Sequence, residues 1–254
     1  MRLLALFLAS ALVATPVTPT STGFPAELSV ELQGVLGRYL EAAQTQRDSM
    51  RGTKMDLEID GRLPKLKEQG RMHLVRLIDQ AAEATFESTE FTGDDRIKKE
   101  LIARYLTEEQ KSKNFGAMSI SPQDYDYKIR AIVKHNGETT YVFDVDPKKR
   151  VAGRFRGELW LDGRTGMPLL EKGQLVKSPN VFLTNLRFTR EYELKDGISV
   201  MKHFSSSADV RLGFGSAELD ISFSNFTRLA ARQNGDRLAL GNRPNFWHLN
   251  FQNN

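Results

Sequence analysis

The feature that most constrains the fold is an alternation of apolar and polar residues that runs through the second half of the chain. In "DYDYKIRAIVKHNGETTYVFDV" (124–145), one face collects Tyr125, Tyr127, Ile129, Ala131 and Val133. Asn136-Gly137 then supplies a two-residue turn in which both positions tolerate positive φ. A period of two interrupted by such a turn predicts a hairpin of antiparallel strands.

The same pattern recurs along the chain with hairpin-length connections. Three strands are expected between about residues 53 and 91, and about seven follow Ser119, with Asp196-Gly197 as a further turn. Two segments instead show helical spacing, residues 25–48 and residues 94 or 95 to 111, with Asp94 as a cap for the second. The prediction is an α+β fold, mainly antiparallel β, whose long sheet curls rather than staying flat.

In the first of these helices, the apolar stripe comprises Leu28, Leu32, Val35, Leu36, Tyr39, Leu40 and Ala43.

The N-terminus has the pattern of a secretory signal peptide. One arginine precedes an apolar run of about a dozen residues, which is too short to span a bilayer, and small residues and prolines follow it. Cleavage is expected after Ala11 or Ala14. We therefore divide the chain into a signal peptide (1–14), a polar linker (15–24), one domain (25–231) and an irregular C-terminal tail (232–254).

Composition narrows the class of protein further. The chain has no cysteine, so neither disulfides nor an acylated N-terminal cysteine are possible. A mean hydropathy of −0.43 excludes a multi-span membrane protein. The net charge of +4 is spread over interleaved acidic and basic residues, which is typical of a solvated surface and not of a nucleic-acid site. These properties favour a periplasmic monomer without a stable membrane span.

No motif in the sequence indicates catalysis, a cofactor or a metal. The four histidines are His73, His135, His203 and His248, and none lies close to another in sequence. The aspartates of "FDVDP" (143–147) alternate along a strand end, and the glycines of "GFGSAELD" (213–220) precede no helix that could hold a phosphate. An enzyme would need a site assembled only by the fold.

The stretch "ELWLDGRTGMPLLEKG" (158–173) is interpreted as two strands and their connection. Asp162 can accept backbone N–H bonds across the turn, Thr165 can add a hydroxyl bond, and Gly163 and Gly166 are expected to take positive φ. The turn is therefore predicted to be a corner of the sheet, not a chemical site.

The same stretch resembles the LolA-like superfamily of periplasmic lipoprotein carriers and outer-membrane lipoprotein-sorting proteins. The residues that carry the resemblance are Leu159-Trp160-Leu161-Asp162, Thr165-Gly166 and Met167-Pro168-Leu169, with Gly52-Thr53-Lys54-Met55 after the first helix. The resemblance implies an incomplete, half-open β-barrel whose helices cover an apolar concave face. It also implies a non-enzymatic carrier or sensor that binds a lipid or a lipoprotein acyl chain, without a cofactor.

Candidate cavity residues are the apolar side chains of the later strands. They are Tyr127, Ile129, Phe143, Phe182, Leu186, Phe188, Phe204, Phe214, Ile221 and Phe223. The second helix, through Ile97, Leu101 and Tyr105, is a possible lid. The alternatives that remain open are an ordinary packed core at these positions, a module that binds an envelope protein, and an enzyme.

Overall fold

The structure, a computed structural model, describes residues 26–112, 120–178, 183–211 and 215–229. The signal peptide, the linker, Phe182, Phe214 and the tail from residue 232 lie outside these residues. The elements, in chain order, are α1 (Ala26–Ser49), β1 (Thr53–Leu63), η1 (Pro64–Leu66), β2 (Glu68–Ile78), β3 (Ala84–Gly93), η2 (Ile97–Ile102), α2 (Ala103–Ser112), β4 (Tyr125–His135), β5 (Glu138–Pro147), β6 (Phe155–Asp162), β7 (Pro168–Leu175), β8 (Leu183–Lys195), β9 (Ile198–Val210) and β10 (Gly215–Arg228).

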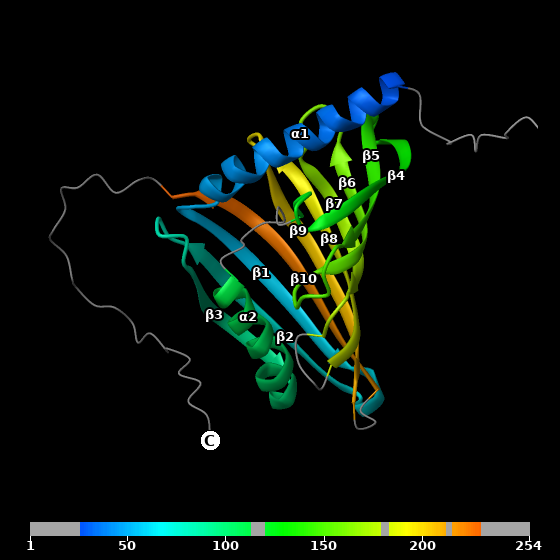
Figure 1. The fold of residues 1–254 in the computed structure, drawn as a ribbon. Helices are drawn as coiled ribbons and strands as arrows, with labels where there is room; N and C mark the ends of the chain where they lie inside the picture. The colour runs from blue at the N-terminus through cyan, green and yellow to red at the C-terminus, as the bar shows by residue number, and fades with distance from the viewer. Residues whose placement is uncertain (1–25, 113–119, 179–182, 212–214, 230–254) are drawn as a thin grey trace, which may run out of the picture.

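All the strands belong to one 10-stranded sheet in the order β3-β2-β1-β10-β9-β8-β7-β6-β5-β4. The pairings between these strands are antiparallel, which confirms the predicted class, and the strands form an open, curved half-barrel with α2 inside it (Figure 1). The one pairing between strands distant in sequence joins β1 to β10. It turns two successive meanders into a single sheet.

The concave face of the sheet carries the hydrophobic core. In β1, for example, buried Met55, Leu57 and Ile59 alternate with half-buried charged residues. This alternation follows from the strand geometry, in which successive side chains point to opposite faces. The opposite, outer face is solvated. None of the described helices is long and apolar enough to cross a membrane.

A row of glycines lets the second helical segment approach the sheet closely. Gly61, Gly70 and Gly93 are paired across β1, β2 and β3. A Cβ at Gly61 would lie 2.7 Å from the Ile97 side chain, so only glycine leaves room for η2 there. Asp94 directly precedes the helix, as predicted, and its carbonyl accepts a hydrogen bond from the Lys98 N–H (3.2 Å). Its carboxylate accepts from the Gln69 backbone N–H (2.9 Å) and so ties the start of this helical segment to β2.

Helix α1 lies across one end of the half-barrel (Figure 1). The Arg38 guanidinium donates to the Gly163 carbonyl (2.7 Å), and the Gln46 side chain both donates to the Ser199 carbonyl and accepts from its N–H. The predicted apolar stripe is fully buried at Val35 and Tyr39, and Leu32, Leu36 and Ala43 pack partly buried against the core, whereas Leu40 is exposed. The stripe is therefore confirmed at these five positions and wrong at Leu40.

The turn from Asp162 to Gly166 is a corner, as predicted. Asp162 Oδ1 accepts hydrogen bonds from the Thr165 N–H (2.7 Å) and the Thr165 hydroxyl (2.6 Å). Gly166 has a φ of +72°, whereas Gly163 does not take a positive φ, contrary to the prediction. A Cβ at Gly163 would instead come within 2.7 Å of the Thr139 carbonyl oxygen, so close packing is the reason for glycine at that position.

The predicted single face of β4 is wrong beyond Ile129. The pairing with β5 shifts between Ile129 and Ala131, which leaves Arg130 as an extra residue. Such a bulge reverses the alternation. Ala131 and Val133 therefore no longer share a face with Tyr127, because they now pair with Val142 and Thr140 instead of continuing the row of Phe143 and Val145.

Candidate functional site

Most of the predicted cavity residues lie on the concave face and are packed into the core. Those that are buried are Phe143, Phe188, Phe204, Ile221 and Phe223. Three others, Tyr127, Ile129 and Leu186, are only half-buried against the same core. The concave face is therefore closely packed at the buried positions and less completely covered at Tyr127, Ile129 and Leu186.

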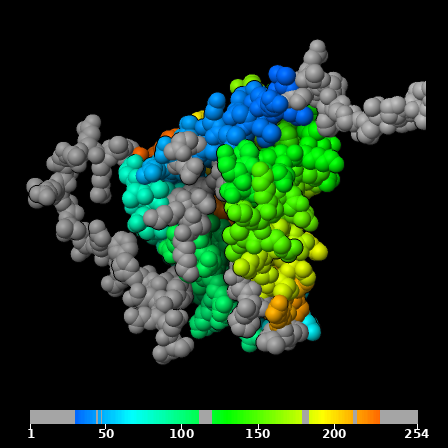
Figure 2. Space-filling model, viewed as in Figure 1, coloured from blue at the N-terminus to red at the C-terminus, as the bar shows by residue number. Residues whose placement is uncertain are grey.

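The predicted lid residues also contact this face, to different degrees. Ile97 is fully buried between the helix and the glycine row, so it is a core residue. Leu101 and Tyr105 are half-buried, and the Tyr105 ring stacks on Phe204 with centroids 5.8 Å apart. On the face shown in Figure 2, the α2 side (cyan to green) and the β4–β8 side (green to yellow) form two flanks below α1.

A polar cluster that the sequence did not reveal lies on this otherwise apolar face. Glu171 on β7 has no exposed surface, and its Oε2 accepts a hydrogen bond from Arg190 Nη1 on β8 (3.1 Å). The Arg190 guanidinium lies over the rings of Phe188 (4.7 Å) and Phe204 (5.9 Å). Since 35% of the Arg190 side chain stays exposed, the cluster is not sealed on the arginine side.

Tyrosines from three elements surround the Glu171 carboxylate. Tyr39 of α1, Tyr127 of β4 and Tyr192 of β8 all interact electrostatically with it. Burial raises the pKa of each of these phenols, and the nearby carboxylate raises it further. Burial also raises the pKa of Glu171, while the Arg190 charge opposes this shift. We define Glu171, Arg190, Tyr39, Tyr127 and Tyr192 as the inner polar cluster.

A second ion pair lies on the same face nearer to α2. The Arg76 side chain, 3% exposed, contacts Glu109 at 3.1 Å and lies over the Phe223 ring at 5.4 Å. Burial raises the pKa of Tyr105 beside it, and the Glu109 charge adds to this effect. Each of these two acids therefore lies beside an arginine on the concave face.

The groups of the inner polar cluster have partners within the cluster and on the backbone. The Tyr192 hydroxyl is a hydrogen-bond partner of the Glu171 carboxylate. The Tyr127 hydroxyl donates to the Ile120 carbonyl (2.7 Å), and the Tyr39 hydroxyl also interacts with the Ile120 backbone. The buried Glu171 carboxylate is thus held by an arginine and a tyrosine hydroxyl.

The signal for this cluster was present in the sequence as interruptions of the apolar alternation. Arg190 occupies the position between Phe188 and Tyr192 on the inner face of β8, and Glu171 occupies the corresponding position between Leu169 and Gly173 on β7. Their pairing depends on the β7–β8 register, in which Glu171 lies opposite Arg190. A charge on an apolar face was the available signal, and its partner came only from the fold.

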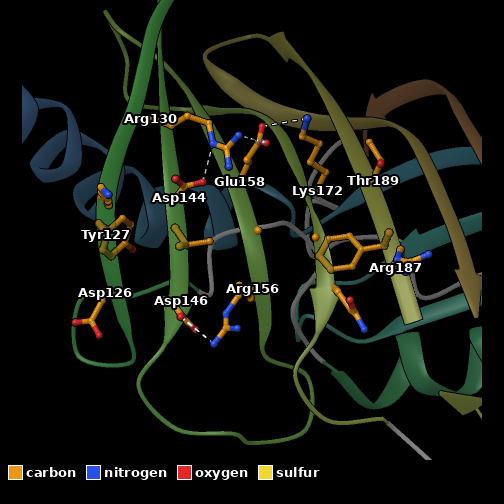
Figure 3. A pocket seen from close by; sticks show the side chains of 16 residues that line it. Asp126, Tyr127, Arg130, Asp144, Asp146, Arg156, Glu158, Lys172, Arg187 and Thr189 are labelled. Atoms are coloured by element: carbon orange, nitrogen blue, oxygen red, sulfur yellow. Dashed lines mark hydrogen bonds and ion pairs between the residues drawn. The ribbon is translucent and has the colours of Figure 1, made fainter. Parts of the chain in front are cut away.

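The outer face carries a lattice of ion pairs and a hollow of about 730 Å³ across β4 to β8 (Figure 3). Figure 3 shows Arg130, Asp144, Glu158 and Lys172 along one side of it and Asp126, Asp146 and Arg156 along the other. Tyr127 and Phe188 also border this hollow. Burial alone would raise the pKa of Glu158, but hydrogen bonds from Trp160 and Lys172 lower it.

A smaller hollow of about 240 Å³ continues the larger one toward β10 and shares Arg187, Phe188 and Thr189 with it. It is bordered by the serines of "HFSSSAD" (203–209), Ser205, Ser206 and Ser207. Most residues that line the two hollows are charged or carry a hydroxyl group, but most of the surface of the larger hollow is apolar. The outer face therefore combines ionic groups with apolar surface, whereas the candidate residues for an apolar ligand lie on the concave face.

The described histidines lie apart from the inner polar cluster. His203 Nε2 contacts the Asp220 carboxylate at 3.0 Å, and His73 Nδ1 contacts Glu58 at 3.5 Å, both in the outer lattice. His135 packs edge-on against Trp160, and His248 lies outside the described residues. Over residues 26–112, 120–178, 183–211 and 215–229, no group of three His, Asp or Glu side chains is arranged to hold a metal ion.

Comparison with solved structures gives matches over most of the chain at low sequence identity. A LolA superfamily protein from Nitrosomonas europaea is 13% identical with a TM-score of 0.38, covering 78% of this chain and 93% of that one. A domain described as an outer membrane lipoprotein-sorting protein, from Vibrio parahaemolyticus, is 13% identical with a TM-score of 0.41, covering 77% of this chain and 94% of that one.

The matches also include the MucA/MucB complex of Pseudomonas aeruginosa, at 13% identity and a TM-score of 0.24, covering 78% of this chain and 99% of that one. No protein-family model and no curated protein matches the sequence. The solved structures thus include the superfamily that the motif at residues 159–169 resembles. The function proposed below rests on the residues of this chain.

Proposed function

We propose that this protein is a non-enzymatic binding protein that holds an apolar ligand, such as a lipid or a lipoprotein acyl chain, against its concave face. One observation carries the proposal: half-buried apolar side chains on β4, β8 and α2 share this face with a small buried polar cluster. Sites for apolar ligands are usually built in this way, with an apolar surface and a few convergent polar anchors.

The polar residues of the concave face fit a binding role better than a catalytic one. Glu171 is held by Arg190, and Arg76 is held by Glu109, so each charged group already has an opposite charge as its partner. Such pairing stabilises the ionised groups in place. The tyrosines resist ionisation because their pKa values are raised, and they therefore act as hydrogen-bonding groups rather than as bases.

Export is part of the same proposal. The apolar run near the N-terminus has the length and flanking residues of a cleaved signal peptide, and it would deliver the domain to the periplasm. A lipid carrier is useful in that compartment because acyl chains cannot cross an aqueous space unshielded. N-terminal sequencing of the exported protein tests this step, with a new terminus after Ala11 or Ala14 as the expected result.

A protein partner is the second candidate, and one feature favours it. In the described part of the sheet, β4 forms an edge that is paired only to β5, and Ile132 on it is 43% exposed. An exposed sheet edge can accept an additional strand from a partner. Affinity purification would then recover one stoichiometric protein whose binding is lost when β4 is altered.

Binding of a fluorescent fatty-acid probe tests the main proposal. We expect saturable binding to the parent protein and a loss of more than about tenfold in affinity for Ile129→Glu, which places an unpaired carboxylate on the concave face. Ile132→Glu on the same strand is the matched control, because Ile132 is already exposed, and it should bind normally. Absence of probe binding to the parent protein, or equal binding by both variants, would contradict the proposal.

A further inference from the structure

The two hollows of the outer face meet at β8. The larger hollow, of about 730 Å³, falls within the range of about 300–1,000 Å³ that is common for small-molecule sites, and most of its surface is apolar. Arg187, Phe188 and Thr189 border both hollows. The junction of the hollows is therefore a candidate site for the polar end of a ligand whose remaining part is apolar.

Hydrogen-bond donors from two strands lie together at this junction. In the β8–β9 register, Arg187 lies opposite Ser207 and Thr189 lies opposite Ser205. Since residues two apart on a strand point to the same face, the four side chains form one patch, which we define as the Arg187 site. Figure 3 shows Arg187 and Thr189 at the β8 end of the larger hollow. The guanidinium can present two parallel N–H groups to an oxyanion, and each of the three hydroxyls can donate as well.

The charges around the Arg187 site leave it available for an anion. Each acidic residue that lines either hollow lies within 3.7 Å of a basic group; the pairs are Asp126–Lys148, Asp144–Arg130, Asp146–Arg156, Glu158–Lys172, Glu218–Arg62 and Asp220–His203. Within the described part of the chain, Arg187 and Lys128 are the basic residues of the hollows without an acidic partner, and Lys128 lies on β4, at the far side of the larger hollow. An anion at Arg187 would therefore meet a positive charge without displacing an existing ion pair.

A bulge in β8 lies directly beside the Arg187 site. Thr184 lies opposite Asp209 and Arg187 lies opposite Ser207, so β8 holds one residue more than β9 over this stretch. Within the bulge, Asn185 has a φ of +52°, and its side-chain amide donates to the Asp209 carboxylate (2.7 Å). Bulges of this kind are common next to functional sites because they redirect a side chain. The local distortion of β8 thus accompanies the orientation of Arg187.

We propose that the outer face binds an organic anion, whose carboxylate or phosphate group is held at the Arg187 site and whose apolar body lies along the larger hollow. From the Arg187 site this hollow extends over β7, β6 and β5 to β4, past Gly157 and Gly173, which lie opposite each other and carry no side chains. The site lies on the opposite face of the sheet from the candidate residues for the apolar ligand. It therefore goes beyond the function proposed above and does not depend on it.

Two fluorescent probes that differ in one group test the site. Anilinonaphthalene sulfonate and phenylnaphthylamine share a ring skeleton, but only the first carries an oxyanion. Arg187→Gln should weaken sulfonate binding about fivefold and leave phenylnaphthylamine binding unchanged, because it removes only the charge-assisted hydrogen bonds. Arg104→Gln is the control for net charge and should change neither affinity, since Arg104 is exposed on α2 and lines neither hollow. In NMR spectra, the sulfonate should shift the amide signals of Gly157 and Gly173 in the parent protein but not in Arg187→Gln.

Competition identifies the anionic group. Naphthoate and naphthyl phosphate should both displace the sulfonate, and the stronger competitor shows which oxyanion the site prefers. Inorganic phosphate should compete only at far higher concentration, because it has no apolar body to bury. Three results would overturn the proposal: no sulfonate binding to the parent protein, equal effects of Arg187→Gln and Arg104→Gln, or inorganic phosphate that competes as well as naphthoate.

The concave face is tested separately. Ile129 lines neither hollow, so Ile129→Glu should leave the Arg187-dependent part of sulfonate binding unchanged. Uptake of the fluorescent fatty-acid probe that depends on Ile129 but not on Arg187 supports the function proposed above whatever the sulfonate does. A failure of the Arg187 site is thus distinguishable from a failure of that function.

Discussion

Truncating Phe188 to alanine tests whether the concave face is filled at the centre of the sheet. The Phe188 side chain is 6% exposed, its ring packs edge-on against Phe155 with centroids 4.9 Å apart, and the Arg190 guanidinium lies 4.7 Å above it. Loss of burial together with the cavity left behind should cost about 3–5 kcal/mol of unfolding free energy. The aromatic pair accounts for about 0.5–1.5 kcal/mol of that loss.

Urea unfolding followed by circular dichroism measures this loss directly. The half-buried Leu186 on the same strand provides the comparison, and Leu186→Ala should cost clearly less than Phe188→Ala because part of its side chain is already exposed. In thermal melts, the Phe188→Ala loss corresponds to a decrease in Tm of roughly 6–20 °C. A loss below about 1 kcal/mol for Phe188→Ala would refute the reasoning, because the ring would then border empty space.

Three further perturbations follow from the structure. The pKa values of all six tyrosines are raised. Tyrosinate absorbance at 295 nm should therefore stay low above pH 10 and rise only when the protein unfolds, because the folded state loses stability as the pH rises past the ordinary phenol pKa. Normal titration of the tyrosines in the folded protein would contradict this. Because the raised pKa of Glu171 makes the folded state bind its proton more tightly, stability should decline as pH rises from 4.5 through that pKa, and Glu171→Gln should remove this part of the slope in urea midpoints. Gly61→Val would clash with Ile97 and should lower the free energy of unfolding by about 1–3 kcal/mol. Gly37→Ala, which has open space around its Cβ, should stabilise α1 by about 0.5–1 kcal/mol. Equal melting temperatures for the two variants would count against this packing.

The element order could be predicted from the sequence because local patterns determine it. The turn at Asn136-Gly137 and the alternation on either side of it need only short-range geometry, and β4 and β5 form there as expected. The bulge at Arg130 was missed because nothing in the local pattern distinguishes an extra residue from a regular one. It changed which residues of β4 share a face.

Features that depend on distant pairing could not be predicted. The register of β1 on β10 joins residues such as Ile59 and Ile221, and no local pattern carries that information. The inner polar cluster has the same origin, because Glu171 and Arg190 are ordinary charged residues until the β7–β8 register places them opposite each other. The apolar candidates within the described residues lie on the concave face, but their degree of burial depends on tertiary packing that the local pattern does not carry.

Native mass spectrometry of the protein purified from its own host tests the central claim most directly. The account predicts a mass above that of the polypeptide by one lipid or acyl-bearing compound, released on denaturation and depleted in the Ile129→Glu variant. A bare polypeptide mass from a preparation that also fails to take up the fluorescent fatty-acid probe, or a stoichiometric protein partner in place of lipid, would contradict it.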